Sequence, residues 1–310
     1  MLAVTGSTGW LGQRVAEGVA GLGFEQRLIV RDPARAPQLP GASVAPVSSY
    51  ADARGMGRAL SGVDTLFLVS AHDRIGIIHR AKMNGQPVPD YDRVHEHIAA
   101  ISAAVAVGVE RIVYLSFVNP APDATFILAR DHFHTEEFIR STGVAFTFLR
   151  PSLYMDKVAQ HVARSDVIRA PAGEGRAAWV ARADVADATV VTLTGRGHEG
   201  RIYDLTGPEA LTMAETAERL SAALGRRISY EPQSPHEARA TRATSRMEEM
   251  EAVRLAHTGE GLTEEEVEIW ISHYVQVATG EASHVSDAVP TLCGRPATSL
   301  AQFLWEHPSP

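Results

Sequence analysis

The sequence predicts an α/β fold built on a doubly wound parallel sheet. Short apolar runs typical of buried strands alternate with stretches of helical periodicity, and a glycine-rich turn joins the first strand to the first helix. This alternation continues to about residue 150, and the intervening helices supply the crossovers that parallel strands need. We therefore expect a Rossmann-type sheet with a smaller, mostly helical C-terminal part.

The first strand, residues 1–5, leads through the glycine turn into a helix over residues 10–21. Gly6 permits the sharp reversal, Gly9 leaves room for an anion at the backbone, and Gly12 lets the helix pack closely on the sheet. Free amides at the helix N-terminus then face that anion. The turn is typical of dinucleotide binding, and its predicted contact residues are Gly6, Ser7, Thr8, Gly9, Trp10, Leu11 and Gly12.

The elements that follow are predicted from apolar runs and helical spacing. The expected strands cover residues 27–30, 43–46, 65–69, 111–116 and 145–149. The expected helices cover residues 51–60, 92–107 and 124–141. Asp123 is placed to cap the last of these helices, and Gly143 lies just beyond its end.

After Arg150 and Pro151 the alternation stops. A strand is expected at 201–205. From Gly207 onward the sequence predicts mainly helices, with one short strand near 228–231. The polar stretch 234–251 is predicted to be either a surface helix or a mobile segment. Capping boxes are expected for the pairs Thr212 with Glu215 and Thr263 with Glu266. We expect residues 1–150, with about 180–207, to form the nucleotide-binding domain, and about 151–179 and 208–310 the smaller substrate-side domain.

Composition indicates an ordinary globular protein. The chain has 310 residues, 45% of them hydrophobic and 21% charged. Its net charge of -8 argues against nucleic acid or an anionic membrane as partner, since such binding needs clustered cations. One cysteine, Cys293, excludes an internal disulfide, and with a strand predicted from Met1 we expect a cytoplasmic protein, either monomer or homodimer.

The end of the second strand indicates which dinucleotide is bound. An acidic side chain normally accepts the ribose hydroxyls of NAD there, but the residue directly after this strand is Arg31, with Arg35 close behind. A guanidinium suits the additional 2′-phosphate of NADP through charge-assisted hydrogen bonds. We expect NADP(H) to be preferred. NAD(H) remains the alternative if Arg31 is only a solvated charge and Asp32 binds the ribose.

An ordered series of motifs extends through most of residues 1–230. It reads VTGSTGWLG, LIVRDPARA, GVDTLFLVSA, GVERIVYLSF, APDATFILARDHFHTEEFIRSTGVAFTFLRPSLYMD and YDLTGPEALT. The series resembles the NmrA-like branch of the atypical short-chain dehydrogenases/reductases, and within it the NAD(P)H:quinone oxidoreductases of the second type and the triphenylmethane-dye reductases. The resemblance implies a Rossmann fold, a small C-terminal domain and NADPH binding.

The catalytic pair of ordinary short-chain reductases is absent. That pair is a Tyr and a Lys four residues later, on the helix after the fifth strand, and these positions hold Leu128 and His132. A general acid contributes roughly 10²- to 10⁴-fold in rate and matters most when hydride delivery leaves a strongly basic alkoxide. A quinone or conjugated dye becomes a delocalised product instead, so the missing Tyr favours such acceptors.

Five residues, at strand ends or on the helix after the fifth strand, are candidates for the site. His132 is placed either to hydrogen-bond the nicotinamide ribose and donate a proton, or to be a partly buried histidine paired with Glu136. Ser116 ends the fifth strand, and Ser70 with Ala71 end the fourth, where backbone contact with the cofactor is expected. Tyr154 follows the sixth strand and either leans over the nicotinamide or belongs to the core.

No metal and no flavin is expected. The closely spaced histidine pairs are two residues apart on helices and point to different faces, and no cysteine set completes a zinc site. Hydride is expected to pass directly from the nicotinamide to the acceptor.

Residues 72–91 form an insertion relative to the family. Part of it, 75–83, is predicted either to roof the substrate pocket as a short helix or to be a surface excursion or oligomer contact.

Two functions remain open at this point. One is an NADPH-dependent oxidoreductase acting on a quinone-like or other conjugated small molecule. The alternative is a non-catalytic NADP(H)-binding redox sensor that acts through a protein partner.

Overall fold

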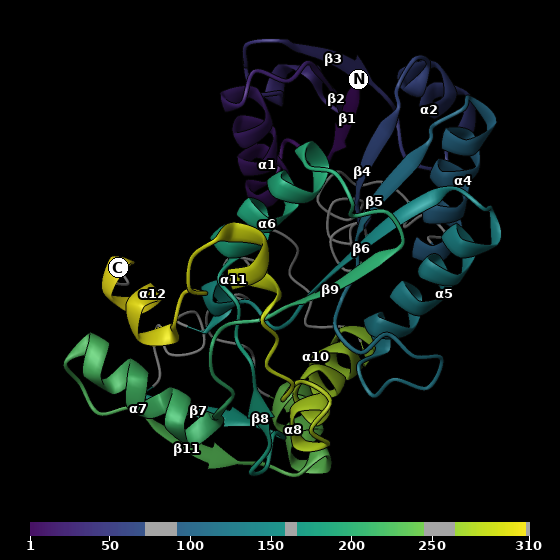
Figure 1. Ribbon diagram of the computed structural model, residues 1–310. Coiled ribbons are helices and arrows are strands. Elements are labelled where there is room, and N and C mark those ends of the chain that lie inside the picture. Colours follow the sequence, from purple (N-terminus) through teal and green to yellow (C-terminus); the bar gives the residue numbers. More distant parts are fainter. Residues whose placement is uncertain (72–91, 159–165, 245–263, 308–310) are drawn as a thin grey trace.

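A seven-stranded, fully parallel sheet organises the molecule (Figure 1). The computed structural model describes residues 1–71, 92–158, 166–244 and 264–307. The strand order β3-β2-β1-β4-β5-β6-β9 reverses direction of growth at β1, which is the switch point where doubly wound sheets bind ligands. The strands are β1 (Leu2–Thr5), β2 (Gln26–Val30), β3 (Ala42–Pro46), β4 (Thr65–Val69), β5 (Arg111–Leu115), β6 (Ala145–Pro151) and β9 (Arg201–Leu205).

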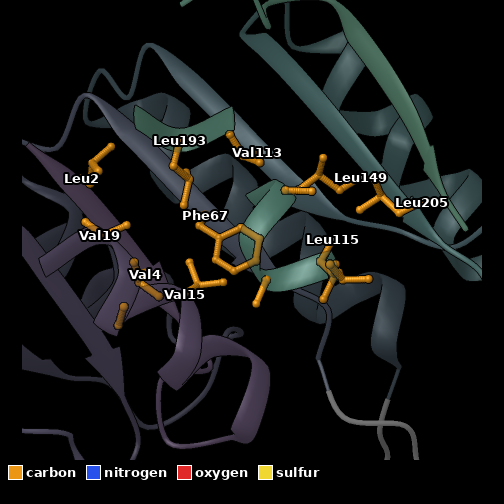
Figure 2. Packing of buried hydrophobic residues seen from close by; sticks show 14 of the residues in the cluster. Leu2, Val4, Val15, Val19, Phe67, Val113, Leu115, Leu149, Leu193 and Leu205 are labelled. Carbon is orange, nitrogen blue, oxygen red and sulfur yellow. The ribbon is translucent and has the colours of Figure 1, made fainter. Parts of the chain in front are cut away.

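Helices cover both faces of the sheet. One face carries α1 (Trp10–Gly21) and α6 (Arg182–Thr194), which pack side by side, and the other carries α2 (Ala53–Leu60), α4 (Arg93–Ala106) and α5 (Ile127–Ser141). Figure 2 shows Val15 of α1 beside Phe67 of β4, and Val19 of α1 near Leu2 and Val4 of β1, in the first of these two cores. Strands buried on both faces explain the continuous apolar runs in the sequence.

The smaller part packs below the carboxyl ends of the strands in Figure 1. Two short strand pairs, β7 with β11 and β8 with β10, share a core with its helices. Its elements are η2 (Met155–Lys157), β7 (Val167–Ala170), β8 (Arg176–Ala177), β10 (Leu211–Thr212), α7 (Met213–Leu224), β11 (Ser229–Pro232), α8 (Pro235–Thr244), α10 (Glu264–Ala278) and α12 (Leu300–Glu306). The remaining helix, α11 (Ala288–Cys293), packs instead on α6 and β9 in the core of the sheet.

The predicted fold class and strands are confirmed, while one helix start is wrong. The helix expected from residue 124 begins at Ile127, and its N-cap is Phe126, so Asp123 does not cap it. The reason is tertiary: Thr125 donates both its amide and its hydroxyl to Glu281, which holds the chain extended before the helix. The capping box of Thr212 and Glu215 is confirmed.

Some predictions lie outside the described residues, namely the insertion at 72–91 and the cap at Thr263. The assignment of the chain to two domains stays a prediction.

Candidate functional site

The glycine turn has the geometry of a cradle for a diphosphate. Gly6 has a φ of 66°, and its carbonyl accepts from the Gly9 amide at 2.9 Å. A Cβ on Gly12 would lie 2.4 Å from the Gly6 carbonyl oxygen, so no side chain fits there. No side chain of the described residues caps α1 at Gly9, which leaves the first amides of the helix for an anion.

The predicted contact residues around this turn differ in exposure. Ser7 is fully buried, and its Oγ has no hydrogen-bond partner among the described residues. Thr8 and Leu11 are partly buried, whereas Trp10 is exposed. The mixture suits a turn that is packed on the sheet side and open toward a ligand.

Two arginines lie exposed at the end of β2. Arg31 follows the strand directly, and Arg35 ends the short 3-10 helix η1 (Pro33–Arg35). Asp32, the acidic alternative for ribose binding, accepts from the Ala34 amide at 3.0 Å and caps this helix. The guanidinium groups are therefore available to a ligand, while one carboxylate oxygen of Asp32 already has a backbone partner.

His97 on α4 holds the end of β4. The Ala71 amide, next to Ser70, donates to His97 Nε2 at 2.8 Å, so the ring proton is on Nδ1, which donates to Thr135 Oγ1 at 2.8 Å. His97 is fully buried, and burial lowers its pKa well below the usual value, with Arg93 adding to the effect. A neutral imidazole thus fixes the chain where cofactor contact is expected.

His132 on α5 is buried and both of its ring nitrogens have partners. Arg93 Nη2 donates to Nε2 at 2.9 Å, which leaves the proton on Nδ1 to be donated to Tyr114 Oη at 2.8 Å. Burial, and then Arg93, lower the pKa of His132 well below its usual value. The predicted pairing of His132 with Glu136 is wrong. Glu136, one turn further along α5, accepts hydrogen bonds from Ser116, Arg140 and Arg150 instead.

Ser116 belongs to a buried ion-pair network. Its hydroxyl donates to Glu136 Oε1 at 2.6 Å, and Arg150 Nε donates to the same oxygen at 2.8 Å while Arg150 Nη2 donates to Oε2. Arg140 also donates to Glu136 Oε2, at 3.3 Å. This network satisfies the carboxylate of Glu136, which is 1% exposed, and engages the Ser116 hydroxyl.

Tyr154 lies with a cluster that sequence patterns did not indicate. Arg182, the first residue of α6, stacks on the Trp10 ring at 4.8 Å and pairs with Asp156 at 2.7 Å. Tyr154 lies two residues before Asp156 in a bridge to Val180, and burial raises the pKa of its phenol. The fold thus brings a cation from the second half of the chain to the start of α1, a juxtaposition without a local sequence signal.

The described residues contain no group of three or more potential metal ligands, and no described helix is long and apolar enough to cross a membrane. Of the predicted candidates, the structure brings His132 and Ser116 to neighbouring positions beside β5, and places Tyr154 near the glycine turn by way of Arg182 and Trp10. Arg31 and Arg35 lie apart from them at the end of β2.

Comparison with known proteins identifies the family. A family model described as NAD(P)H-binding matches residues 6–195. The chain belongs to this family. It is 30% identical to an NAD(P)H azoreductase of Xenophilus azovorans, covering 99% of this chain and 98% of that protein. It is 33% identical to a (4-alkanoyl-5-oxo-2,5-dihydrofuran-3-yl)methyl phosphate reductase of Streptomyces griseus subsp. griseus, with the same coverage.

A solved structure supports the same conclusion. The NADPH complex of an NADPH-dependent quinone oxidoreductase from Escherichia coli matches with a TM-score of 0.82 and 27% identity over 100% of both chains. The predicted resemblance is confirmed, and with it the enzyme class, an NAD(P)H-dependent oxidoreductase.

Proposed function

We propose that the protein reduces a quinone-like or otherwise conjugated small molecule with NADPH, by direct hydride transfer and without a Tyr/Lys pair. One observation carries the proposal: an open glycine cradle coexists with a catalytic helix that has Leu128 at the usual tyrosine position. The next candidate donor, His132, is neutral and already engaged at both nitrogens. Such a site suits an acceptor that needs little help from a general acid.

The names of three relatives specify acceptors that are also conjugated. Azo groups, unsaturated lactones and quinones all accept hydride at one end of a conjugated system. In a quinone the displaced electron pair spreads over the oxygen and the aromatic ring that forms, so the product is a much weaker base than an alkoxide. Proton transfer from water then suffices to complete the reduction.

The residues present fit NADPH. Gly12 lets α1 pack directly on the turn, the uncapped N-terminus of α1 suits the diphosphate, and the exposed Arg31 and Arg35 suit the 2′-phosphate. Arg182, which pairs with Asp156, stacks on the Trp10 ring at the start of α1 and lies close to the turn. When bound, NADPH supplies the hydride, and the chain orients it through the turn and the Ala71 backbone that His97 fixes.

Cofactor preference and turnover can be tested together. Arg31→Ala is expected to weaken NADPH binding about ten- to a hundred-fold, because a charge-assisted pair with the 2′-phosphate is lost, and to leave NADH binding unchanged. Arg54→Ala, an exposed arginine on α2, is the matched control and should change neither affinity. Titration of the nicotinamide fluorescence measures both constants.

The same protein is then assayed for NADPH oxidation with quinones, azo compounds, unsaturated lactones and simple ketones. We expect turnover of conjugated acceptors and none of simple ketones. Tight NADPH binding without turnover of any acceptor would contradict the proposed reaction and support the redox sensor. Equal loss of NADPH and NADH affinity in Arg31→Ala would contradict the assigned role of Arg31.

A further inference from the structure

Arg93 is a buried cation with unused hydrogen-bond donors. Its side chain is 9% exposed, and Nε and Nη1 are buried without a hydrogen-bond partner among the described residues. Among the described residues, Nη2 donates to His132, and Nη1 forms a loose ion pair with Asp131 Oδ2 at 3.6 Å, which is long for a hydrogen bond. Buried donors without an acceptor are rare in folded proteins, and a catalytic role is one of the established reasons for keeping them.

The fold places Arg93 beyond the carboxyl edge of the sheet. His97, on the same face of α4, receives the Ala71 amide just after β4 ends. Arg93 lies one turn nearer the start of α4, about 6 Å further along the helix axis. Because α4 follows β4 and returns antiparallel to it, that turn lies above the strand ends, where open α/β sheets bind ligands.

The neighbours of Arg93 also mark this as the reaction site. His132, its hydrogen-bond partner, is the residue that the sequence predicts at the position where ordinary short-chain reductases have their catalytic lysine. The Phe117 ring, two residues after β5, stacks on His132 with ring centroids 6.4 Å apart. Cation, imidazole and aromatic ring therefore come together from α4, α5 and the end of β5.

We propose that Arg93 binds the oxygen of a conjugated carbonyl acceptor and stabilises the negative charge that hydride transfer creates there. This inference rests on the proposed function and specifies its substrate class: acceptors whose reduction leaves an oxyanion. Arg93 then does with a fixed cation what a tyrosine does by proton transfer in ordinary short-chain reductases. The existing hydrogen bond to His132 holds the guanidinium in place before the acceptor arrives.

The charge balance separates two kinds of acceptor. In quinone reduction a C–H bond of NADPH breaks, its hydride joins the acceptor, NADP⁺ forms, and the acceptor oxygen becomes an anion that takes a proton from water. A cationic triphenylmethane dye accepts the same hydride at its central carbon and becomes neutral, so no anion develops. A cation in the site therefore assists the first reaction and not the second.

The first experiment compares Arg93→Gln, Arg93→Lys and wild type with a 1,4-naphthoquinone and a cationic triphenylmethane dye. Arg93→Gln is expected to lower kcat/KM for the quinone about 10²- to 10³-fold, the cost of removing one donor to a developing oxyanion. It should not lower kcat/KM for the cationic dye, because the guanidinium repels that substrate. Arg93→Lys retains a cation and should recover part of the quinone rate. Arg196→Gln, an exposed arginine after α6, is the matched control.

A second readout does not need turnover. 4-Nitrophenol added to the wild-type complex with NADP⁺ is expected to bind as the yellow phenolate, with its apparent pKa lowered by about one unit or more next to Arg93. In Arg93→Gln this shift should disappear while the affinity for NADP⁺ is unchanged. Equal losses with quinone and dye, or the same phenolate shift in both proteins, would overturn the inference.

The proposed function and this inference fail in different ways. If wild type turns over neither acceptor yet binds phenolate through Arg93, the proposed function is wrong and the anion site stands. If wild type reduces the quinone and Arg93→Gln does so equally well, the proposed function stands and the role of Arg93 is wrong.

Discussion

Three buried or partly buried histidines are neutral for reasons that can be read from their partners. His97 and His132 each accept a hydrogen bond at Nε2 from a group that can only donate, the Ala71 amide and the Arg93 guanidinium. His273 on α10 packs edge-on against the rings of Phe126 and Tyr274. Burial lowers the pKa of His273 to about 4.

These histidines predict that the protein loses stability in mild acid. In the unfolded chain each takes up a proton near pH 6.5, whereas the folded state does not, so the free energy of unfolding falls as pH drops below 6.5. Each neutral histidine contributes a slope of about 1.4 kcal/mol per pH unit. His273→Phe keeps the ring contacts and should reduce the slope between pH 6 and 5 by about that amount.

Urea unfolding at several pH values measures this slope. An identical slope in wild type and His273→Phe would show that His273 is protonated in the folded protein.

At the scale of elements, α6 ties the end of the described chain to the sheet. Asp184 is fully buried on α6, and it accepts from Arg295 at 2.8 Å and from the amide and hydroxyl of Thr298. Arg295 also donates to Asp187 at 2.7 Å, one turn along the same helix. The segment between α11 and α12 is thereby fixed against α6.

Removal of the arginine should therefore destabilise the protein. Arg295→Ala is expected to lower the free energy of unfolding by about 2 kcal/mol, because the buried carboxylate of Asp184 loses its cationic partner. The loss is smaller than for a fully buried pair, because Arg295 is 40% exposed. The control is Arg169→Ala, which breaks an exposed pair with Glu231 and should cost less than about 1 kcal/mol. Denaturant titration of both variants compares them, and equal losses would contradict a special role for the α6 contacts.

Local sequence patterns predict most of the elements but not the polar contacts between them. The strands from β1 to β6 follow from apolar runs, and the glycine turn follows from spacing, because both depend on neighbouring residues. The start of α5 is wrong because Glu281, far along the chain, holds Thr125. Arg93 and Arg182 were not predicted for the same reason: their partners are supplied by other elements.

At the scale of the whole molecule, the C-terminal region completes the core under the nucleotide-binding turn. Ala288 and Val289 of α11 and Ala297 pack in the same hydrophobic cluster as Val4 of β1 and Val15 of α1. Glu281 and Ser272 in turn receive hydrogen bonds from the segment before α5. The stability of the sheet and the stability of the smaller part thus depend on the same contacts.

We therefore expect a single unfolding transition. Trp10 lies at the start of α1, while Trp179 and Trp270 belong to the core of the smaller part. In the Trp10→Phe variant, tryptophan fluorescence follows the unfolding of the smaller part. Far-ultraviolet circular dichroism follows the loss of secondary structure in the whole protein. The two denaturation curves should coincide, and saturating NADPH should shift both by the same amount. Two separate midpoints would show that the parts unfold independently.

The shared core has a consequence for how the protein is made. A ribosome delivers β1 and α1 first, yet the apolar surface beside them is closed only when residues 288–297 have emerged. Until then the nascent sheet carries an uncovered apolar patch, which chaperones bind and which favours aggregation. The order of synthesis therefore separates the first strand and helix from the residues that complete their core by almost the whole length of the chain.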